Sequence, residues 1–166
     1  MRDLKSITDL CLEELKSIGI KCGKIRNLEI NNRAKCRLGQ CTRVSIGVFD
    51  ISIAGFLLEE KNDINILKNT VIHELLHTVK GCFNHTGKWK LLAGMVNENY
   101  PQYKIKRTFN RTEIADMTDI KEPVYRYVLK CKNCGLEIKR QRKSKAVINY
   151  KNYRCGECGG NLERIK

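Results

Sequence analysis

Four cysteines near the C-terminus constrain the fold of this chain more than any other feature. They form two Cys-x2-Cys pairs, Cys131 with Cys134 and Cys155 with Cys158, and twenty residues separate the pairs. Each pair can form a knuckle, and two knuckles can close a tetrahedral site of four sulfur ligands around one zinc ion. A glycine follows each pair, where the backbone has to turn tightly around the sulfurs. The pattern predicts a structural zinc site in a β-type zinc ribbon.

The segment that carries these cysteines, residues 121–166, is too short to build a sufficient core of its own. Zinc binding is therefore expected to supply much of the free energy that folds it. A redox function is the alternative for a Cys-x2-Cys pair, and the presence of two matched pairs argues against it. The other five cysteines show no metal-like grouping and are expected to be free buried thiols: Cys11, Cys22, Cys36, Cys41 and Cys82.

The histidines are the second unusual feature. The chain has only three, His73, His77 and His85, and all of them fall within thirteen residues. His73 and His77 frame the motif His-Glu-Leu-Leu-His, and on a helix that advances about 100° per residue they lie about 40° and one turn apart. Both imidazoles can thus reach one metal ion, while Glu74 can reach a metal-bound water as a general base. The alternative is a core helix that happens to carry histidines.

A catalytic zinc site usually has three protein ligands and an open position for water. Gly81 is expected to end the helix, so that the chain can turn back and bring His85 to the ion. Three neutral imidazoles leave the zinc its full charge and lower the pKa of a bound water to about 7, which gives a hydroxide able to attack a peptide carbonyl. Two alternatives stay open: His85 is an ordinary loop residue, or Cys82 supplies the third ligand.

Apolar spacing predicts three helices and a small sheet in the first 120 residues. The helices are expected over residues 3–18, 64–80 and 87–100. Their ends are marked by Gly19, Gly81 and Pro101, and Asn62–Asp63 provides an N-cap for the second. Short β-type runs between residues 24 and 58 predict a few antiparallel strands, with turns or bulges at Gly39–Gln40 and Gly47. The mixed polar stretch 111–123 is expected to connect this unit to the ribbon.

Charge is concentrated in the ribbon. The chain carries a formal net charge of +14, and residues 121–166 hold 13 Lys and Arg against 4 Asp and Glu, a net of +9. Such an excess points to a polyanionic partner, most often nucleic acid. Cations that neutralise phosphates and aromatics that stack on bases predict a surface for single-stranded nucleic acid, with DNA as the expected partner. It comprises Lys139, Arg140, Arg142, Lys143, Lys145, Tyr150 and Tyr153. The alternative is a solvated hairpin tip whose tyrosines pack on the knuckles.

The sequence predicts a cytoplasmic protein, associated with the nucleoid if the source is bacterial. The N-terminus lacks the unbroken apolar run of a signal peptide, and the longest apolar stretch, residues 51–58, is far too short to span a bilayer. No basic amphipathic helix stands out, so no membrane partner is expected. The sequence makes no prediction of the oligomeric state.

The arrangement of these motifs resembles the SprT-like family, which includes the eukaryotic protease Spartan and the bacterial SprT proteins. Members are similar in pairing an HExxH helix with a downstream His-x3-Trp or His-x3-Phe element, matched here by His85 and Trp89. The stretch RAKCRLGQC resembles the family's strand of the form R-W-G-x-C through Arg37, Gly39 and Cys41. Leu38 stands where that pattern usually has tryptophan, so any role of that ring is lost. The resemblance covers nearly the whole chain.

This resemblance implies an α+β chain with a small zincin-like metalloprotease core over residues 1–120, in which helices pack on a short antiparallel sheet, followed by the zinc ribbon of residues 121–166. It implies a zinc metallopeptidase with one catalytic zinc on His73, His77 and His85, Glu74 as catalytic base, and one structural zinc in the ribbon. The better-known relatives act on proteins bound or crosslinked to DNA, with DNA as activator, which carries the expectation of DNA–protein crosslink repair.

Two other functions are compatible with the same motifs. The first is a non-catalytic nucleic-acid-binding protein with two structural zinc sites, which the intact Glu74 argues against because a structural site has no use for a base beside its first ligand. The second is a metallopeptidase with no role at DNA, whose activity would survive removal of residues 121–166. For the side chain that stabilises the oxyanion, Tyr100 and Tyr103 are candidates because they follow the third predicted helix.

Overall fold

The computed structural model describes residues 1–109 and 124–166, and the chain divides into two compact units, residues 1–120 and 121–166. The predicted polar connector of residues 111–123 lies outside the described residues. Within the described ranges, no helix is both long and apolar enough to cross a membrane.

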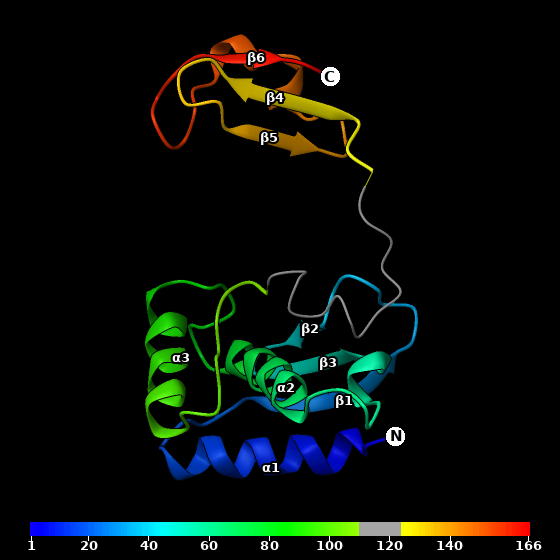
Figure 1. Ribbon diagram of the computed structural model, residues 1–166. Helices are drawn as coiled ribbons and strands as arrows, with labels where there is room; N and C mark the ends of the chain where they lie inside the picture. The colour runs from blue at the N-terminus through cyan, green and yellow to red at the C-terminus, as the bar shows by residue number, and fades with distance from the viewer. Residues whose placement is uncertain (110–123) are drawn as a thin grey trace. The chain divides into compact units, whose positions relative to one another are not determined.

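The first unit combines three helices with a three-stranded sheet (Figure 1). In chain order its elements are α1 (Leu4–Ser17), β1 (Lys24–Asn31), β2 (Gly39–Ser45), β3 (Val48–Ala54), the 3-10 turn η1 (Gly55–Leu58), α2 (Ile64–Thr78) and α3 (Gly87–Asn99). The three predicted helices are confirmed to within two residues at each end. A mixed α+β unit with a small sheet was also expected.

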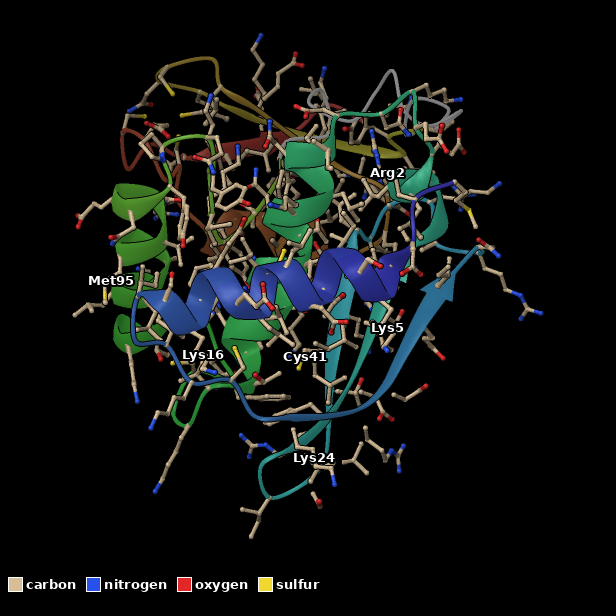
Figure 2. The ribbon with its side chains drawn as sticks, turned by 90° about the horizontal axis from the view of Figure 1, so that it is seen from below. Arg2, Lys5, Lys16, Lys24, Cys41 and Met95 are labelled. Atoms are coloured by element: carbon tan, nitrogen blue, oxygen red, sulfur yellow. The ribbon has the colours of Figure 1, made fainter. Side chains whose placement is uncertain are left out.

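Local signals explain where the helices begin and end. The Asp3 carboxylate accepts a hydrogen bond from the Ser6 N–H at the start of α1, and the Asp63 carboxylate accepts one from the Asn65 N–H at the start of α2. After α1 the chain turns at Gly19, whose φ of 81° is a left-handed conformation that glycine adopts without strain. Figure 2 views the unit from the side of α1, with Lys5 and Lys16 labelled on that helix.

The sheet differs from the prediction in the direction of one strand. Its order is β1-β3-β2, in which β2 and β3 are antiparallel but β1 runs parallel to β3. The tight turn at Gly47, with a φ of 72°, joins β2 to β3 as a hairpin. Residues 32–38 carry the chain past the position that β3 later fills, so that β3 enters between β1 and β2. The predicted short sheet and the antiparallel pairing of β2 with β3 are confirmed, whereas the antiparallel direction expected for β1 is wrong. The alternation of apolar residues along a strand does not depend on the direction of its neighbour, so it could not show this.

The helix α2 is the centre of the unit. It packs on β2 and β3, and both α1 and α3 pack on it. Its apolar residues Val71, Ile72, Leu75 and Leu76 are completely buried, as the helical pattern predicted. Burying side chains of this size stabilises the fold by about 1.5–3 kcal/mol each. A helix packed on three sides is held rigidly, so the polar residues that it carries are held rigidly too.

A polar cluster ties α1 to α2 and to the segment after α3. The Lys68 ammonium donates to Glu14 Oε1 at 2.6 Å and to the Tyr103 hydroxyl at 2.7 Å, and that hydroxyl donates to Glu14 Oε2 at 2.7 Å. Burial alone would lower the pKa of Lys68, but its hydrogen bonds to Glu14 and Tyr103 outweigh burial and raise that pKa. The cluster is thus a fully paired, half-buried ion pair.

Removing the charge of Glu14 should destabilise the first unit. In Glu14→Gln the half-buried ammonium of Lys68 loses its counter-ion, and we expect the free energy of unfolding to fall by about 2 kcal/mol. Urea denaturation at neutral pH measures the change. Glu13→Gln, an exposed neighbour with the same change of charge, is the control. Equal midpoints for the two variants would show that the cluster adds nothing to stability.

The second unit is built on a smaller sheet. Its elements are β4 (Tyr127–Cys131), β5 (Glu137–Arg140), the short helix α4 (Lys145–Ile148), the 3-10 turn η3 (Tyr150–Asn152) and β6 (Leu162–Arg164). The sheet order is β5-β4-β6 and both pairings are antiparallel. The buried core of this unit consists of Leu129, Cys131, Cys155 and Leu162, with Ile138 and Tyr150 packed against it. Val147 on α4 is also buried. Two of the four residues in the core cluster are cysteines, so little apolar surface is available to fold the unit.

Candidate metal sites

The three histidines converge on one point. His73 and His77 lie one turn apart on α2, and His85 comes from the loop between α2 and α3. The Nε2 atoms of His73 and His85 are 2.8 Å apart, and the His77 Nε2 lies 3.2 Å from that of His73 and 3.1 Å from that of His85. The three ring nitrogens therefore form a small triangle, and these residues could hold a metal ion.

Backbone carbonyls select the ring form that a metal needs. The His73 Nδ1 lies 3.1 Å from the carbonyl oxygen of Lys106, and the His77 Nδ1 lies 3.0 Å from that of Cys82. A carbonyl oxygen only accepts, so each Nδ1 must carry the hydrogen and each Nε2 must present its lone pair. Lone pairs that face one another without a cation repel, whereas a shared cation attracts them. The geometry and chemistry of the donors thus fit a metal ion.

The same cluster keeps its imidazoles neutral. Burial, together with the electrostatic effects of His77 and His85, lowers the pKa of His73 to about 4. Burial is also the main cause that lowers the pKa of His77 and of His85. Metal binding requires neutral imidazole. For a tetrahedral zinc with Zn–N bonds of about 2.05 Å, the nitrogens would be about 3.3 Å apart, close to the observed spacing.

The turn after α2 explains why His85 can reach the cluster. The helix ends at Thr78, and Gly81 adopts a φ of 84° before the chain folds back. The Cys82 N–H donates to the Val79 carbonyl at 2.9 Å, which sets the Cys82 carbonyl in place for His77. The Cys82 side chain is fully buried, and burial raises the pKa of its thiol. Cys82 thus contributes its carbonyl to the site, and its sulfur does not belong to the group of candidate ligands.

Trp89 forms the wall behind the imidazoles. It lies in the first turn of α3, is almost completely buried, and places its ring centroid 4.8 Å from His73, 5.7 Å from His77 and 4.7 Å from His85. One side chain therefore packs on all three rings. This accounts for the four-residue separation between His85 and Trp89, because the loop and the first turn of α3 must reach the same point.

Glu74 lies beside the cluster in an apolar setting. Burial raises the pKa of its carboxyl to about 7, while the backbone N–H of Cys41 and the charge of Arg37 oppose the shift. The carboxylate packs directly on the edge strand β2: a Cβ added at Gly39 would lie 2.7 Å from both Glu74 Cγ and Oε1. Position 39 thus requires glycine for a local steric reason.

A cavity of 630 Å³ opens in front of these residues. It is lined by Gly39, Cys41, His73, Glu74, His77, Phe83, Asn84, His85, Thr86 and Arg107. Arg107 was not singled out from the sequence, because nothing in its surroundings there marks it as functional. Tyr100 and Tyr103, the earlier candidates for oxyanion stabilisation, do not line this cavity, and their hydroxyls bond to Glu14 on α1. That interpretation of the two tyrosines is wrong.

The four cysteines of the ribbon also converge. The Sγ atoms of Cys131 and Cys158 are 3.5 Å apart, and those of Cys134 and Cys155 are 3.7 Å apart. A tetrahedral zinc with Zn–S bonds of about 2.3 Å places its sulfurs about 3.8 Å apart, whereas a disulfide bond is about 2.05 Å long. The four cysteines are free thiols that could hold a metal ion.

The two knuckles have the same backbone geometry. In the first, Gly135 N–H donates to the Cys131 carbonyl at 3.0 Å; in the second, Gly159 N–H donates to the Cys155 carbonyl at 2.9 Å. Both glycines are left-handed, with φ of 73° and 69°. The backbone N–H of Cys134 is the main cause that lowers the pKa of the Cys131 thiol, whereas hydrogen bonds with the other cysteines raise the pKa of Cys134, so the four thiols share their protons unequally. Such repeated geometry is what two matched Cys-x2-Cys pairs require.

The seven residues predicted to contact nucleic acid are not equivalent. Lys139 lies 3.8 Å from Glu137, which partly neutralises it, and Tyr150 packs against the ribbon core. The other five are exposed: Arg140, Arg142, Lys143, Lys145 and Tyr153. Lys145 is also the first residue of α4. For Tyr150 the structure therefore agrees with the alternative of packing on the knuckles.

Sequence analysis missed an arginine–tyrosine group at one end of the ribbon sheet. Arg140 lies opposite Tyr127 in the β4–β5 ladder, and the Arg164 guanidinium lies 5.1 Å from the centre of the Tyr127 ring. Arg126 and Arg142 line a hollow of 330 Å³ nearby. Arg126, Tyr127 and Arg164 lie outside the run of cations at 139–145, so only strand pairing could have linked them to it.

Comparisons with known proteins support part of the sequence-based interpretation. The chain is 46% identical over 41 residues to "Protein SprT-like" from Oceanobacillus iheyensis. That stretch is 25% of this chain and 25% of that protein, so the chain matches about a quarter of the relative's length. No family model matches the chain, and no solved structure matches it. The partial match and the two candidate metal sites are compatible with a zinc-dependent, SprT-like protein.

Metal analysis should find two zinc ions per chain, one on each candidate group. His85→Ala removes one of three imidazoles, and Cys134→Ser removes one of four thiolates; each variant should retain only one zinc, because the two groups bind independently. Inductively coupled plasma mass spectrometry of the purified proteins measures the content. Cys36→Ser, which lies outside both groups, should retain two. A second zinc still bound to His85→Ala would exclude His85 as a required ligand.

Proposed function

We propose that this protein is a zinc-dependent endopeptidase that cleaves proteins bound or crosslinked to DNA. The observation that supports this most directly is a buried carboxylate, Glu74, beside three converged imidazoles in an open cavity of 630 Å³. In this proposal His73, His77 and His85 hold the catalytic zinc, and the four ribbon cysteines hold a structural zinc. When bound, the catalytic metal supplies a Lewis acid that activates water and polarises a carbonyl.

Other residues of the chain orient the metal ligands, transfer protons and bind the substrate. Lys106 and Cys82 hold two imidazoles through their carbonyls, so that the lone pairs of Nε2 face the ion. Glu74 takes the proton of the attacking water and later gives it to the leaving amine. In the metal-free chain burial raises the pKa of this carboxyl to about 7, so burial favours a carboxyl that can hold a proton between the two transfers. Among the described strands β2 lies at the edge of its sheet, and its residues Gly39 and Cys41 line the cavity, where an extended substrate could pair with the backbone of β2.

The alternative of a purely structural zinc at the histidines has less support. Structural zinc sites are closed by four protein ligands. In the described part of the chain, three histidines form this group, and no fourth cysteine or carboxylate joins it. The cavity also leaves room for a substrate at the open position. A closed structural site would have neither an open position on the metal nor space for a substrate beside it.

Replacing Glu74 should separate catalysis from metal binding. In Glu74→Gln we expect the cleavage rate of a DNA-binding protein such as a histone to fall by about 10²–10⁴-fold, because proton transfer is lost, while the zinc content stays at the wild-type value. Gel analysis of product formation, with and without single-stranded DNA, measures the effect of the substitution and the effect of DNA on the cleavage rate. A cleavage rate that does not change with DNA would support the peptidase activity but contradict the proposed role at DNA. If the zinc-loaded wild type cleaves nothing, the result favours the alternative of a non-catalytic nucleic-acid-binding protein.

The nucleic-acid partner is proposed from the ribbon's charge. Residues 121–166 carry a net charge of +9, and Arg140 and Arg164 lie beside Tyr127 at one end of their sheet. Arginine can pair with phosphate bidentately and tyrosine can stack on a base, so single-stranded DNA fits this surface. The proposed cytoplasmic, nucleoid-associated location and the role in DNA–protein crosslink repair both depend on this partner.

Removing one exposed ribbon arginine should weaken DNA binding in a salt-dependent way. For Arg142→Gln we expect weaker binding of a single-stranded oligonucleotide of any sequence and a salt slope reduced by about 1. Fluorescence anisotropy titrations at several salt concentrations provide both values. The control is Lys132→Gln, whose ammonium lies 4.0 Å from Glu163 and is already partly neutralised. An Arg142 variant with wild-type affinity and slope would exclude this phosphate contact.

A further inference from the structure

Arg107 lies where two cavities meet beside Glu74. A second cavity, of 240 Å³, adjoins the one in front of the histidines. The two share four lining residues, Gly39, His73, Glu74 and Arg107. These four therefore surround the junction of the cavities, where a substrate that occupied both would pass the candidate metal ligands and the candidate base.

The charge of Arg107 is available to a substrate. Among the described residues that line either cavity, Arg107 is the one lysine or arginine. Within residues 1–109 and 124–166 it forms no ion pair with a carboxylate, in contrast to Lys68 or Arg26. Its positive charge is also felt at the cluster, where it adds to the effects of burial and of His77 in lowering the pKa of His85.

The backbone just before Arg107 is firmly held. Asn97 on α3 accepts from the Ile105 N–H at 2.7 Å and donates to the Ile105 carbonyl at 3.0 Å, and Asn69 on α2 accepts from the Lys104 N–H at 3.1 Å. Ile105 itself is buried in the core. The next carbonyl, that of Lys106, faces His73. Arg107 therefore follows directly after a residue whose position is fixed to a metal ligand.

The geometry points to Arg107 as the catalytic residue that stabilises the oxyanion of peptide hydrolysis. The water oxygen bonds to the scissile carbonyl carbon while Glu74 takes a proton, and the electron pair of the carbonyl moves onto its oxygen. The guanidinium of Arg107 donates hydrogen bonds to that oxygen. The intermediate then collapses, the carbon–nitrogen bond breaks, and Glu74 returns the proton to the leaving amine. A preplaced donor of this kind acts on charge that develops in the transition state.

This inference rests on the proposed peptidase function. A cation in a substrate cleft could instead bind a carboxylate of the substrate, but that contact would be made equally in the ground state and the transition state. The position of Arg107 at the junction, with His73 and Glu74 in both linings, favours contact with the reacting carbonyl over contact with a distant side chain. The two roles differ in which kinetic constant they change.

Arg107→Gln should therefore lower kcat and leave KM nearly unchanged. We expect kcat for a fluorogenic peptide to fall by about 10²-fold and KM to change by less than about threefold, with unchanged zinc content. Arg107→Lys keeps the positive charge but lacks the paired N–H donors of the guanidinium, so its kcat should lie between those of wild type and Arg107→Gln. Arg33→Gln is the control, since it is exposed and lines neither cavity. A raised KM with wild-type kcat, or no change at all, would overturn the assignment.

Binding of a phosphinic peptide provides a readout that does not depend on turnover. Its tetrahedral anion resembles the oxyanion, so calorimetry should show affinity about 10²-fold lower for Arg107→Gln than for wild type and for Arg33→Gln. Equal affinities would overturn the assignment whether or not the wild type cleaves peptides. An inactive wild type would refute the proposed peptidase alone, whereas an active wild type with an equally active Arg107→Gln would refute only the role of Arg107.

Discussion

Two hydrogen bonds from imidazole to backbone carbonyl hold the candidate catalytic site together. The Lys106 carbonyl fixes His73 and the Cys82 carbonyl fixes His77, each from outside the helix that carries the histidines. Both carbonyls must be placed to a few tenths of an ångström, and each has its own support. Gly81 allows the turn that presents Cys82, and Asn97 anchors the segment that presents Lys106. Much of the first unit can be understood as the framework for these two bonds.

The parts of the site that follow from local geometry were predictable from sequence. Helical spacing alone brings His73 and His77 to one side of α2, and a left-handed glycine lets the chain return with His85. The matched Cys-x2-Cys pairs likewise predicted two similar knuckles. In each case the residues that act together are close in the chain, or the turn that joins them has a distinctive residue. Short-range rules are enough for such features.

Features that depend on tertiary packing could not be predicted in the same way. The parallel pairing of β1 with β3 depends on which edge β2 occupies, and alternation in a strand carries no information about that. Arg107 reaches the cavity because Asn69 and Asn97 hold residues 104–105 against two helices, and amides have many other uses. Backbone carbonyls have no sequence signature at all. Tyr103 was misassigned for the same reason, since its partner Glu14 lies on a helix far away in the sequence.

The two units are stabilised in different ways, so the loss of metal should affect the folding of each unit differently. The first buries a continuous apolar core around α2, so we expect it to fold without a metal at the histidines. This unit also contains the buried Glu74, whose pKa burial raises. The core cluster of the ribbon has four buried residues, two of them cysteines, so we expect metal–sulfur bonds to supply much of its folding free energy. Loss of zinc would thus leave the first unit folded without its reactive ion but remove the surface that carries most of the positive charge. In the proposed arrangement a metal would act as a cofactor in the first unit and as part of the core of the second.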